Sequence, residues 1–202
     1  MANIAAIRSA GSSLATYLDR AYRATNFPDG VNRPNCTFSL TTIGGLQAAN
    51  INVANGSAHV LILLYRVSMN QHMRTSGRPV RPDMDPPPLS VDLHYLLSFW
   101  AGGAEIEQLI LAWTLRQMHQ TPVLDPSILS QEAAWAADDV IQLIPEEISN
   151  EDLMRIWDAL EPHYRLSLSY IARVVRIDPD ETPDHRRVVA SRFNFAVPDG
   201  ER

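Results

Sequence analysis

The sequence contains no lysine and only one cysteine, Cys36. All 17 basic residues are therefore arginines; they form no basic run, and the net charge is −6, so we expect no nucleic-acid partner. A single cysteine excludes an intramolecular disulfide framework and any CxxC metal site. We expect Cys36 to be a small buried apolar residue rather than a reactive thiol.

Long apolar runs are also missing. No stretch approaches the ~18 apolar residues of a membrane-spanning helix, and the N-terminus lacks the charged start and apolar run of a secretory signal. We therefore expect a soluble protein that is made in the cytoplasm and has no membrane partner. The chain has 202 residues, 46% of them hydrophobic, which is enough for one sizeable core. One domain over residues 1–177, followed by a tail over residues 178–202, is the expected organisation.

The common enzyme motifs GxSxG, GxGxxG, the P-loop and HExxH are absent as well. His94 and Asp92 stand two residues apart, so the carboxylate could orient the imidazole in a small hydrolase or ligand-binding domain. No motif places a nucleophile or a third partner near them, and a hydrogen-bonded histidine of the core or of an interface is the favoured interpretation. We expect no catalytic residues, and the chain is interpreted as a non-enzyme.

Acidic residues gather in three places without forming a recognisable metal site. The stretch Asp178–His185 lacks the glycine and the bidentate glutamate of an EF-hand loop, which favours a solvated loop. The pairs Asp138-Asp139 and Glu146-Glu147 are interpreted as cap and surface charges, because adjacent residues on a strand face opposite ways. The sequence therefore predicts neither a metal nor a cofactor.

The most distinct pattern is a strand, a turn and a helix between Leu89 and Leu124. Residues Ser90–Phe99 alternate, with Val91, Leu93, Tyr95, Leu97 and Phe99 on one side, which predicts a half-buried strand. Gly102 and Gly103 break the strand, and the spacing then changes to that of a helix. This helix carries two apolar stripes, of which Leu111, Leu115 and Met118 form the second. A second covering surface, from this chain or a neighbouring subunit, is therefore needed.

Other segments complete a mixed α+β (α/β) domain. A helix is expected over Asn3–Thr25, a short strand over Cys36–Leu40, a strand pair or mobile loop over 41–57 and a short helix over Ser127–Ala137. Ser149 and Asp152 match a capping box before an apolar stripe. The expected central sheet contains Ala58–Met69, Ser90–Phe99, Val140–Ile144 and Arg165–Ile177, and the helices Ala104–His119 and Ser149–Leu160 cover it. Ala58–Met69 reads as a central strand whose polar far end, with Arg66 and Ser68, projects past the sheet.

Three groups of residues are candidate contact positions. The proline-rich loop Asn70–Pro88, with Arg74, Arg78 and Arg81, suits an arm that contacts a neighbour. Strand addition is expected at Arg165–Ile177 or at a tail strand over Val188–Phe195, where Arg173, Arg176 and Arg192 discourage indiscriminate pairing. The helix stripe Leu111/Leu115/Met118 is the third group.

Several of these elements together carry a family resemblance. The relevant residues are Pro88-Leu89, Asp92–Leu97, the helix leading to His119, Pro122–Leu124, Trp157 and Tyr164–Tyr170. In this order they resemble the N-terminal domain of the tail-terminator, or cap, proteins of extracellular contractile injection systems, which are phage-tail-like particles. The similarity covers roughly Ala10 to Ile177.

The resemblance implies a structural protein. It implies a tail-terminator-like fold and a homo-oligomeric, six-fold ring that ends polymerisation of the inner tube and anchors the last sheath ring at the baseplate-distal end. The implied partners are the inner-tube protein and the sheath protein, in a particle that is assembled in the cytoplasm and can be released from the cell. Longer family members extend beyond this domain.

Overall fold

The structure is a computed structural model that describes residues 2–48, 53–70, 88–160 and 164–178. Its elements follow one another as α1 (Ala6–Ala24), β1 (Asn35–Thr41), α2 (Ile43–Ala48), β2 (Ser57–Met69), β3 (Leu89–Ala101), α3 (Ala104–Gln120), β4 (Val123–Leu124), the 3-10 turn η1 (Gln131–Ala133), β5 (Ile141–Pro145), α4 (Asn150–Ala159) and β6 (Ser167–Ile177). Helices and strands do not alternate regularly, which is typical of the expected α+β class.

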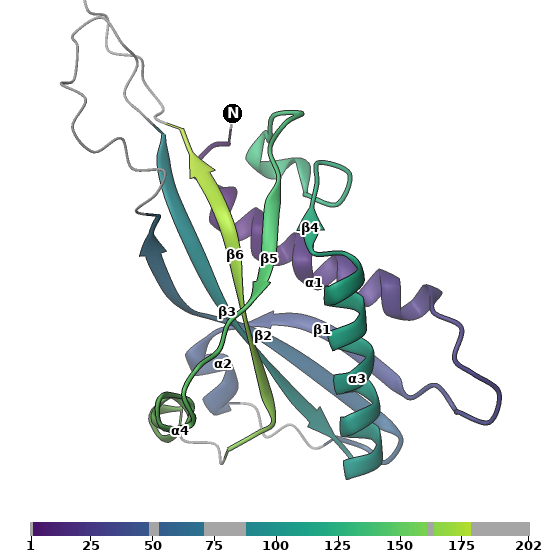
Figure 1. Ribbon diagram of the computed structural model, residues 1–202. Coiled ribbons are helices and arrows are strands. Elements are labelled where there is room, and N and C mark those ends of the chain that lie inside the picture. The colour runs from purple at the N-terminus through teal and green to yellow at the C-terminus, as the bar shows by residue number, and fades with distance from the viewer. Residues whose placement is uncertain (1, 49–52, 71–87, 161–163, 179–202) are drawn as a thin grey trace, which may run out of the picture.

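The strands of the described residues form one curled, six-stranded sheet in the order β1-β2-β3-β6-β5-β4 (Figure 1). Only β1 and β2 pair in parallel, and every other neighbouring pair is antiparallel. A mixed sheet flanked by helices in a single domain confirms the predicted fold class. The parallel pair also explains α2, because parallel neighbours need a crossover between them.

Strand β3 lies inside this sheet and is buried on both faces, whereas a half-buried strand was predicted. Every residue from Val91 to Trp100 is buried. The predicted alternation is right: Val91, Leu93, Tyr95, Leu97 and Phe99 belong to one apolar cluster, and Leu96 and Trp100 to another. The prediction of one solvated face was wrong because helices and polar side chains cover the second face too.

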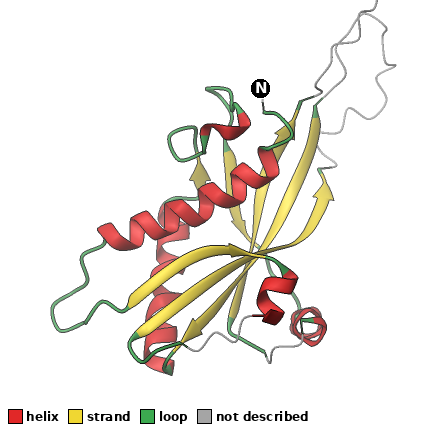
Figure 2. Cartoon of the chain, turned by 180° about the vertical axis from the view of Figure 1, so that it is seen from behind, coloured by secondary structure: helices red, strands yellow, loops and turns green. Residues whose placement is uncertain are grey.

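Helices α1 and α3 bury the larger apolar cluster. Figure 2 shows α1 crossing the sheet on the face toward the viewer. An aromatic group joins both helices to β1: the ring of Trp113 lies 4.9 Å from that of Tyr22 and 5.5 Å from that of Phe38, centroid to centroid. Cys36 of β1 is buried in the same cluster, as expected, and burial together with nearby Asp19 raises its thiol pKa to about 12.

The smaller cluster lies on the opposite face, under α2 and α4. Trp157 and Leu160 pack there against strand residues of β2 and β3. Ser149 caps α4 as predicted, since its hydroxyl accepts from the Asp152 amide at 3.1 Å. Among the described residues, no helix has the length and apolar character needed to span a bilayer.

Two loop predictions were wrong. Residues 41–57 contain the helix α2 rather than a strand pair, because the chain must cross over between parallel β1 and β2. The helix expected over Ser127–Ala137 is reduced to the three-residue η1. The Asp125 carboxylate accepts from the Ser127 amide at 2.9 Å and holds a turn there, and Ala134 ends η1 with a left-handed φ of 52°.

Two strand placements also differ from prediction. Strand β6 lies inside the sheet: it pairs with β3 along most of its length and with β5 over Tyr170–Arg173, so within the described residues only its two ends keep an unpaired side, whereas the whole of Arg165–Ile177 was predicted as an edge. The far end of β2 does not project past the sheet, because it pairs with β3 up to Met69. On its other side, this end of β2 has no partner strand among the described residues, because β1 pairs with β2 no further than Leu63. Residues 71–87, which include the predicted arm, and the predicted tail strand Val188–Phe195 lie outside the described residues.

Candidate functional site

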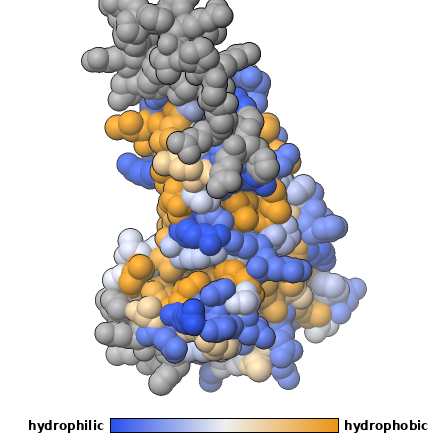
Figure 3. Space-filling model, turned by 60° about the vertical axis from the view of Figure 1, so that its left-hand side comes forward, coloured by the Kyte–Doolittle hydropathy of each residue, from blue (hydrophilic) through white to orange (hydrophobic). Residues whose placement is uncertain are grey.

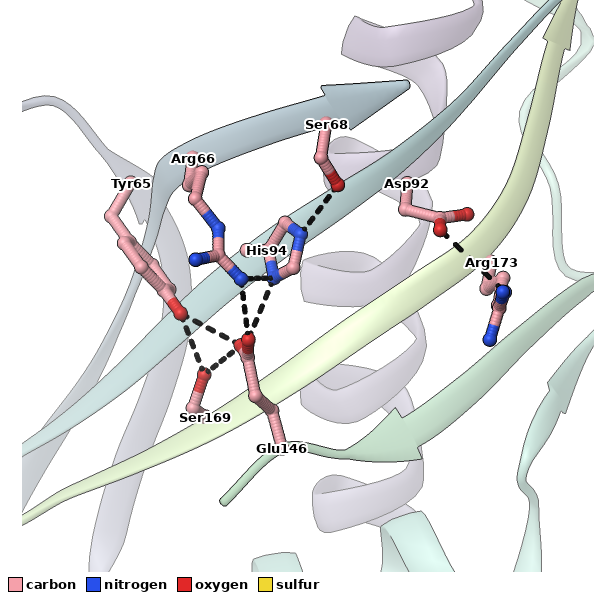
Figure 4. Close-up of polar contacts among 8 residues, drawn as sticks. All are labelled: Tyr65, Arg66, Ser68, Asp92, His94, Glu146, Ser169 and Arg173. Carbon is pink, nitrogen blue, oxygen red and sulfur yellow. Dashed lines mark hydrogen bonds and ion pairs between the residues drawn. The ribbon is translucent and has the colours of Figure 1, made fainter. Parts of the chain in front are cut away.

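A polar cluster occupies the second face of the sheet beyond the α2/α4 layer (Figure 4). We use "polar cluster" for Tyr65, Arg66 and Ser68 of β2, His94 of β3, Ser169 of β6, and Glu146, which directly follows β5. The strand register brings these residues together: Arg66 lies opposite His94, and the Glu146 amide donates to the Ser169 carbonyl at 2.9 Å. Segments 80 or more residues apart in sequence therefore meet at one point.

A β-bulge between Leu64 and Arg66 supplies two of these side chains at once. Adjacent residues of a regular strand face opposite ways, but a bulge adds one residue and re-aims its neighbours. Here both Tyr65 and Arg66 reach the same carboxylate, that of Glu146. The irregularity is what allows β2 to contribute two consecutive residues to the cluster.

Glu146 is the centre of the polar cluster. Its Oε2 accepts from Tyr65 Oη at 2.7 Å and from Ser169 Oγ at 2.8 Å, and its Oε1 accepts from Arg66 Nη2 at 2.8 Å. Burial alone raises the pKa of Glu146, but the hydrogen bonds from Tyr65, Ser169 and His94 outweigh it and hold the pKa below its ordinary value. Burial raises the pKa of Tyr65 to about 12, so this hydroxyl stays a donor. The interpretation of Glu146 as a surface charge was wrong, because its side chain is only 13% exposed.

His94 connects Glu146 to Ser68. Its Nδ1 lies 2.9 Å from Glu146 Oε1 and 3.0 Å from Arg66 Nη2, and its Nε2 lies 2.9 Å from Ser68 Oγ. Arginine can only donate and a carboxylate can only accept, so one ring nitrogen cannot serve both. We assign the proton to Nδ1, which then donates to Glu146, and Ser68 donates to Nε2.

Serine, histidine and glutamate thus stand in the order of a nucleophile, a base and its orienting acid. A hydrolase also needs a substrate cavity and an oxyanion site beside the nucleophile. The groove of about 360 Å³ that Glu146 and Ser169 border is lined by neither Ser68 nor His94. The Arg66 guanidinium also contacts both His94 Nδ1 and Glu146 Oε1. The arrangement therefore ties strands together, as expected for a hydrogen-bonded histidine.

Asp92 is not the partner of His94, although the sequence placed the two side by side. Its carboxylate accepts from the Asn70 amide at 2.9 and 3.1 Å and lies 3.5 Å from Arg173 Nε. Arg173 and Arg176 border a cavity of about 430 Å³ next to Trp135. The two arginines thus share one surface, and Arg173 is partly held by an ion pair. In the described part of the chain no group of three or more His, Cys, Asp or Glu side chains could hold a metal ion.

The helix stripe predicted as an interface is divided by the fold. Met118 is buried in the larger apolar cluster, Leu111 packs partly against it, and Leu115 is 40% exposed. Leu115 borders the groove that also contains Leu153 and Leu168. Of the three residues, only Leu115 is therefore placed to contact a neighbour. Arg74, Arg78, Arg81 and Arg192 lie outside the described residues.

Most of the polar cluster was not predicted from the sequence. Arg66 and Ser68 were expected to project past the sheet, Ser169 was named only as part of the stretch Tyr164–Tyr170, and Glu146 follows a proline that was expected to end its strand. The one available signal was His94, which alternates with apolar residues on a buried strand and so needs buried partners. The identity of those partners depends on strand order.

The fold and the site define an α+β domain in which the groups of the polar cluster bond to one another and in which exposed apolar residues such as Leu115 and Leu40 border open grooves. The chain belongs to the Pvc16 N-terminal domain family, whose model matches residues 11–191.

Two solved structures share this fold. One is the "PVC sheath/tube terminator in extended state" of an extracellular contractile injection system, with a TM-score of 0.55 and 17% identity over 95% of this chain and 64% of that chain. The other is the "anti-feeding prophage cap (AFP tube terminating cap)", with a TM-score of 0.55 and 16% identity over 93% of this chain and 60% of that chain. The chain therefore spans less than two thirds of the length of either structure. The curated proteins contain no match.

Proposed function

We propose that this chain is a non-enzymatic tail-terminator, or cap, domain of a contractile injection system. In this role it forms a homo-oligomeric ring, six-fold by the family resemblance, that ends inner-tube and sheath polymerisation at the baseplate-distal end. The observation that carries the proposal is the combination of family membership over residues 11–191 with a fold shared with a sheath/tube terminator and a tube-terminating cap. The particle is assembled in the cytoplasm, and the partners are the inner-tube protein and the sheath protein.

A terminator domain needs two different surfaces. A helical polymer built from head-to-tail contacts has no internal stop. Its length is limited only when a subunit binds the growing face and offers no equivalent face to the next ring. Neighbours within a closed ring also meet through two unlike surfaces of each subunit.

The groove at Leu115 is our candidate for one of the surfaces between ring neighbours. It has a volume of about 360 Å³ and combines apolar residues of β3, α3, β5, α4 and β6 with the carboxylate of Glu146 at its border. Leu115 is 40% exposed in the isolated chain, and burial of this remaining exposed part would stabilise an interface by about 1 kcal/mol. The exposed Arg176 surface at the other end of β6 is a candidate contact with tube or sheath.

The segment between Asn70 and Pro88 is proposed as a contact arm through Arg74, Arg78 and Arg81. Its prolines lower the ordering cost, because they limit the conformations of the free chain. A chain that lacks residues 76–85 should keep its melting temperature and lose affinity for the particle. A deletion that leaves assembly unchanged would remove the arm from the proposal.

Deletion of the whole chain tests the terminator role. Electron microscopy should show tubes and sheaths of uncontrolled length or prematurely contracted sheaths. The wild-type chain should restore a narrow length distribution, whereas Leu115→Glu should not. Met154→Glu is the matched control, because Met154 is a similarly exposed apolar helix residue, 43% exposed, outside the groove.

Particles of normal length and stability without this chain would contradict the terminator role. The enzyme hypothesis has its own test, which is turnover of ester and amide substrates by the purified protein. Turnover abolished by both Ser68→Ala and His94→Gln would replace the proposal with a hydrolase. We expect none.

A further inference from the structure

The far half of β2 offers an unpaired strand edge. Beyond Leu63, β2 retains β3 on one side, but no strand of the described residues pairs with its other side. In Figure 1 this part of β2 forms the free left-hand border of the sheet. Its side chains include two exposed apolar residues, Val67 at 47% and Met69 at 60% exposed. A free edge with apolar side chains is a template for another strand.

An apolar cavity of about 460 Å³ lies next to this edge. Residues of α1, of the end of β1 and of β2 line it, including Ile7, Gly11, Leu40 and Leu64. Leu40 is itself 41% exposed. Figure 3, which brings the left-hand side of Figure 1 forward, shows apolar patches exposed between polar ones on this side of the molecule. The volume suffices for one large side chain.

The cavity also contains a polar atom without a partner. Tyr95 lines it, is 1% exposed, and its hydroxyl has no hydrogen-bond partner among the described residues. Such buried groups are nearly always paired, so each exception calls for a missing partner. A Cβ at Gly11 would lie only 3.0 Å from this hydroxyl, so glycine keeps the space in front of it open. The cavity is therefore shaped for an apolar side chain accompanied by one hydrogen-bond acceptor, such as a backbone carbonyl.

We propose that residues 188–195 of the same chain add to this edge as a further strand, antiparallel to Arg66–Met69, and insert Phe193 into the cavity. The sequence VVASRFNF of this segment is β-rich, and alternation places Val189, Ser191 and Phe193 on one side. A carbonyl of the inserted segment accepts from Tyr95 Oη.

The path of the chain supports this occupant. The Asp178 amide donates to the Ala2 carbonyl at 2.8 Å, so the tail leaves β6 beside the start of α1, the helix that lines the cavity. Reaching the edge means passing β3 and β2, about 15 Å at roughly 4.8 Å per strand. Residues 179–187 can span about 30 Å at ~3.3 Å per residue. The family match continues to residue 191, so much of this segment belongs to the domain.

Direction and register agree as well. Strands β2 and β6 are both antiparallel to β3, so a tail that turns back after β6 runs antiparallel to β2. With Val189 opposite Met69, Ser191 lies opposite Val67. The extra residue of the β2 bulge then brings Phe193 level with Leu64, which lines the cavity. Attachment within one chain is also favoured by the high effective concentration of a tethered segment.

Disulfide trapping tests the pairing directly. In a Cys36→Ala background, Val67→Cys with Ser191→Cys should form an intrachain disulfide under mild oxidation of the dilute full-length protein. Val67→Cys with Glu201→Cys is the matched control, because residue 201 lies beyond the proposed strand. We expect the first pair to form about tenfold faster. Equal rates for the two pairs, or bonds mainly between two chains, would overturn the proposal.

Hydrogen exchange provides an independent readout. The outward-pointing amides of Arg66–Met69 should exchange about tenfold faster in Phe193→Asp than in the unchanged chain, because the edge then opens. Asn194→Asp places the same charge on the opposite side of the proposed strand and should alter exchange little. Identical exchange in the unchanged chain and in Phe193→Asp would overturn the proposal. Neither experiment requires ring formation, so their outcome is separate from that of the terminator role.

Discussion

The two faces of the sheet are covered in different ways. On one face, two long helices, α1 and α3, bury an apolar cluster that runs along almost the whole of β3. On the other face, the short helices α2 and α4 cover only one part, and the polar cluster around Glu146 occupies the next. The first face stabilises the domain through apolar area. The second holds strands together through hydrogen bonds and borders the groove at Leu115.

The two faces therefore contribute differently to the stability of the domain and, in our proposal, to its contacts with partners. The helix-covered face buries most of the apolar area of the sheet, whereas the groups of the polar cluster bond to one another close to solvent. The groove at Leu115 borders that cluster through Glu146 and Ser169. Substitutions on the two faces should therefore affect different measurements.

The largest effect on stability is expected on the helix-covered face. Trp113→Ala should lower the free energy of unfolding by about 3–5 kcal/mol, because it removes a buried indole from the aromatic group with Tyr22 and Phe38. Chemical denaturation measures this change. Met154→Ala is the control at an exposed apolar position and should change stability by less than about 0.5 kcal/mol. A small effect at Trp113 would mean that this face is not the main source of stability.

A smaller loss is expected in the polar cluster. Glu146→Gln should cost about 2 kcal/mol at neutral pH, because hydroxyl, guanidinium and imidazole donors lose a charged acceptor. Glu147→Gln is the matched control, because Glu147 is the next residue in the chain and its carboxylate is exposed. Equal stability of the two variants would show that Glu146 makes no net contribution.

The same pair of variants should respond to pH. The folded pKa of Glu146 lies below its ordinary value of 4.5, so its contribution is complete above that value and is lost as the pH falls through the lower folded pKa. The stability gap between the unchanged protein and Glu146→Gln should therefore be constant above about pH 5 and shrink on acidification. Denaturation at a series of pH values measures the gap. A gap that widens on acidification would contradict the assigned hydrogen bonds.

A loss of about 1 kcal/mol is expected at the start of α4. Ser149→Ala removes the side-chain acceptor of the Asp152 amide, whose bond measures 3.1 Å. Glu151→Ala removes only an exposed ion pair with Arg155 and should cost less than about 0.5 kcal/mol. Thermal melting compares the two. If they are equally stable, the cap contributes nothing beyond surface charge.

The smallest effect on stability, and the largest on assembly, is expected at Leu115. Leu115→Glu should change the unfolding free energy of the isolated chain by less than about 0.5 kcal/mol, because the side chain is 40% exposed. It should nevertheless shift the mass measured by light scattering from an oligomer to a monomer, because a charge would then be buried in the interface. An unchanged mass would show that the groove is not a contact between neighbouring subunits.

The candidate site was only partly predictable. His94 and Asp92 were singled out from their spacing, and the preference for a hydrogen-bonded histidine agrees with the bonds to Glu146, Arg66 and Ser68. The alternative that Asp92 orients His94 was wrong, because side chains of neighbouring strands and of Glu146 occupy both ring nitrogens of His94. Glu146 could not be found at all, since nothing local distinguishes it from Glu147.

The sequence by itself determined the identity and extent of the main elements. Alternation in β3, helical spacing in α3, the cap at Ser149 and the turn at Gly102-Gly103 are local effects, in which backbone geometry and near neighbours decide the conformation. Only the tertiary structure decided that β6 lies inside the sheet, that both faces of β3 are covered and that Met118 is buried whereas Leu115 is exposed. These depend on strand order and on which helix covers which face. The contacts that select them join residues far apart in the chain, and no local pattern records them.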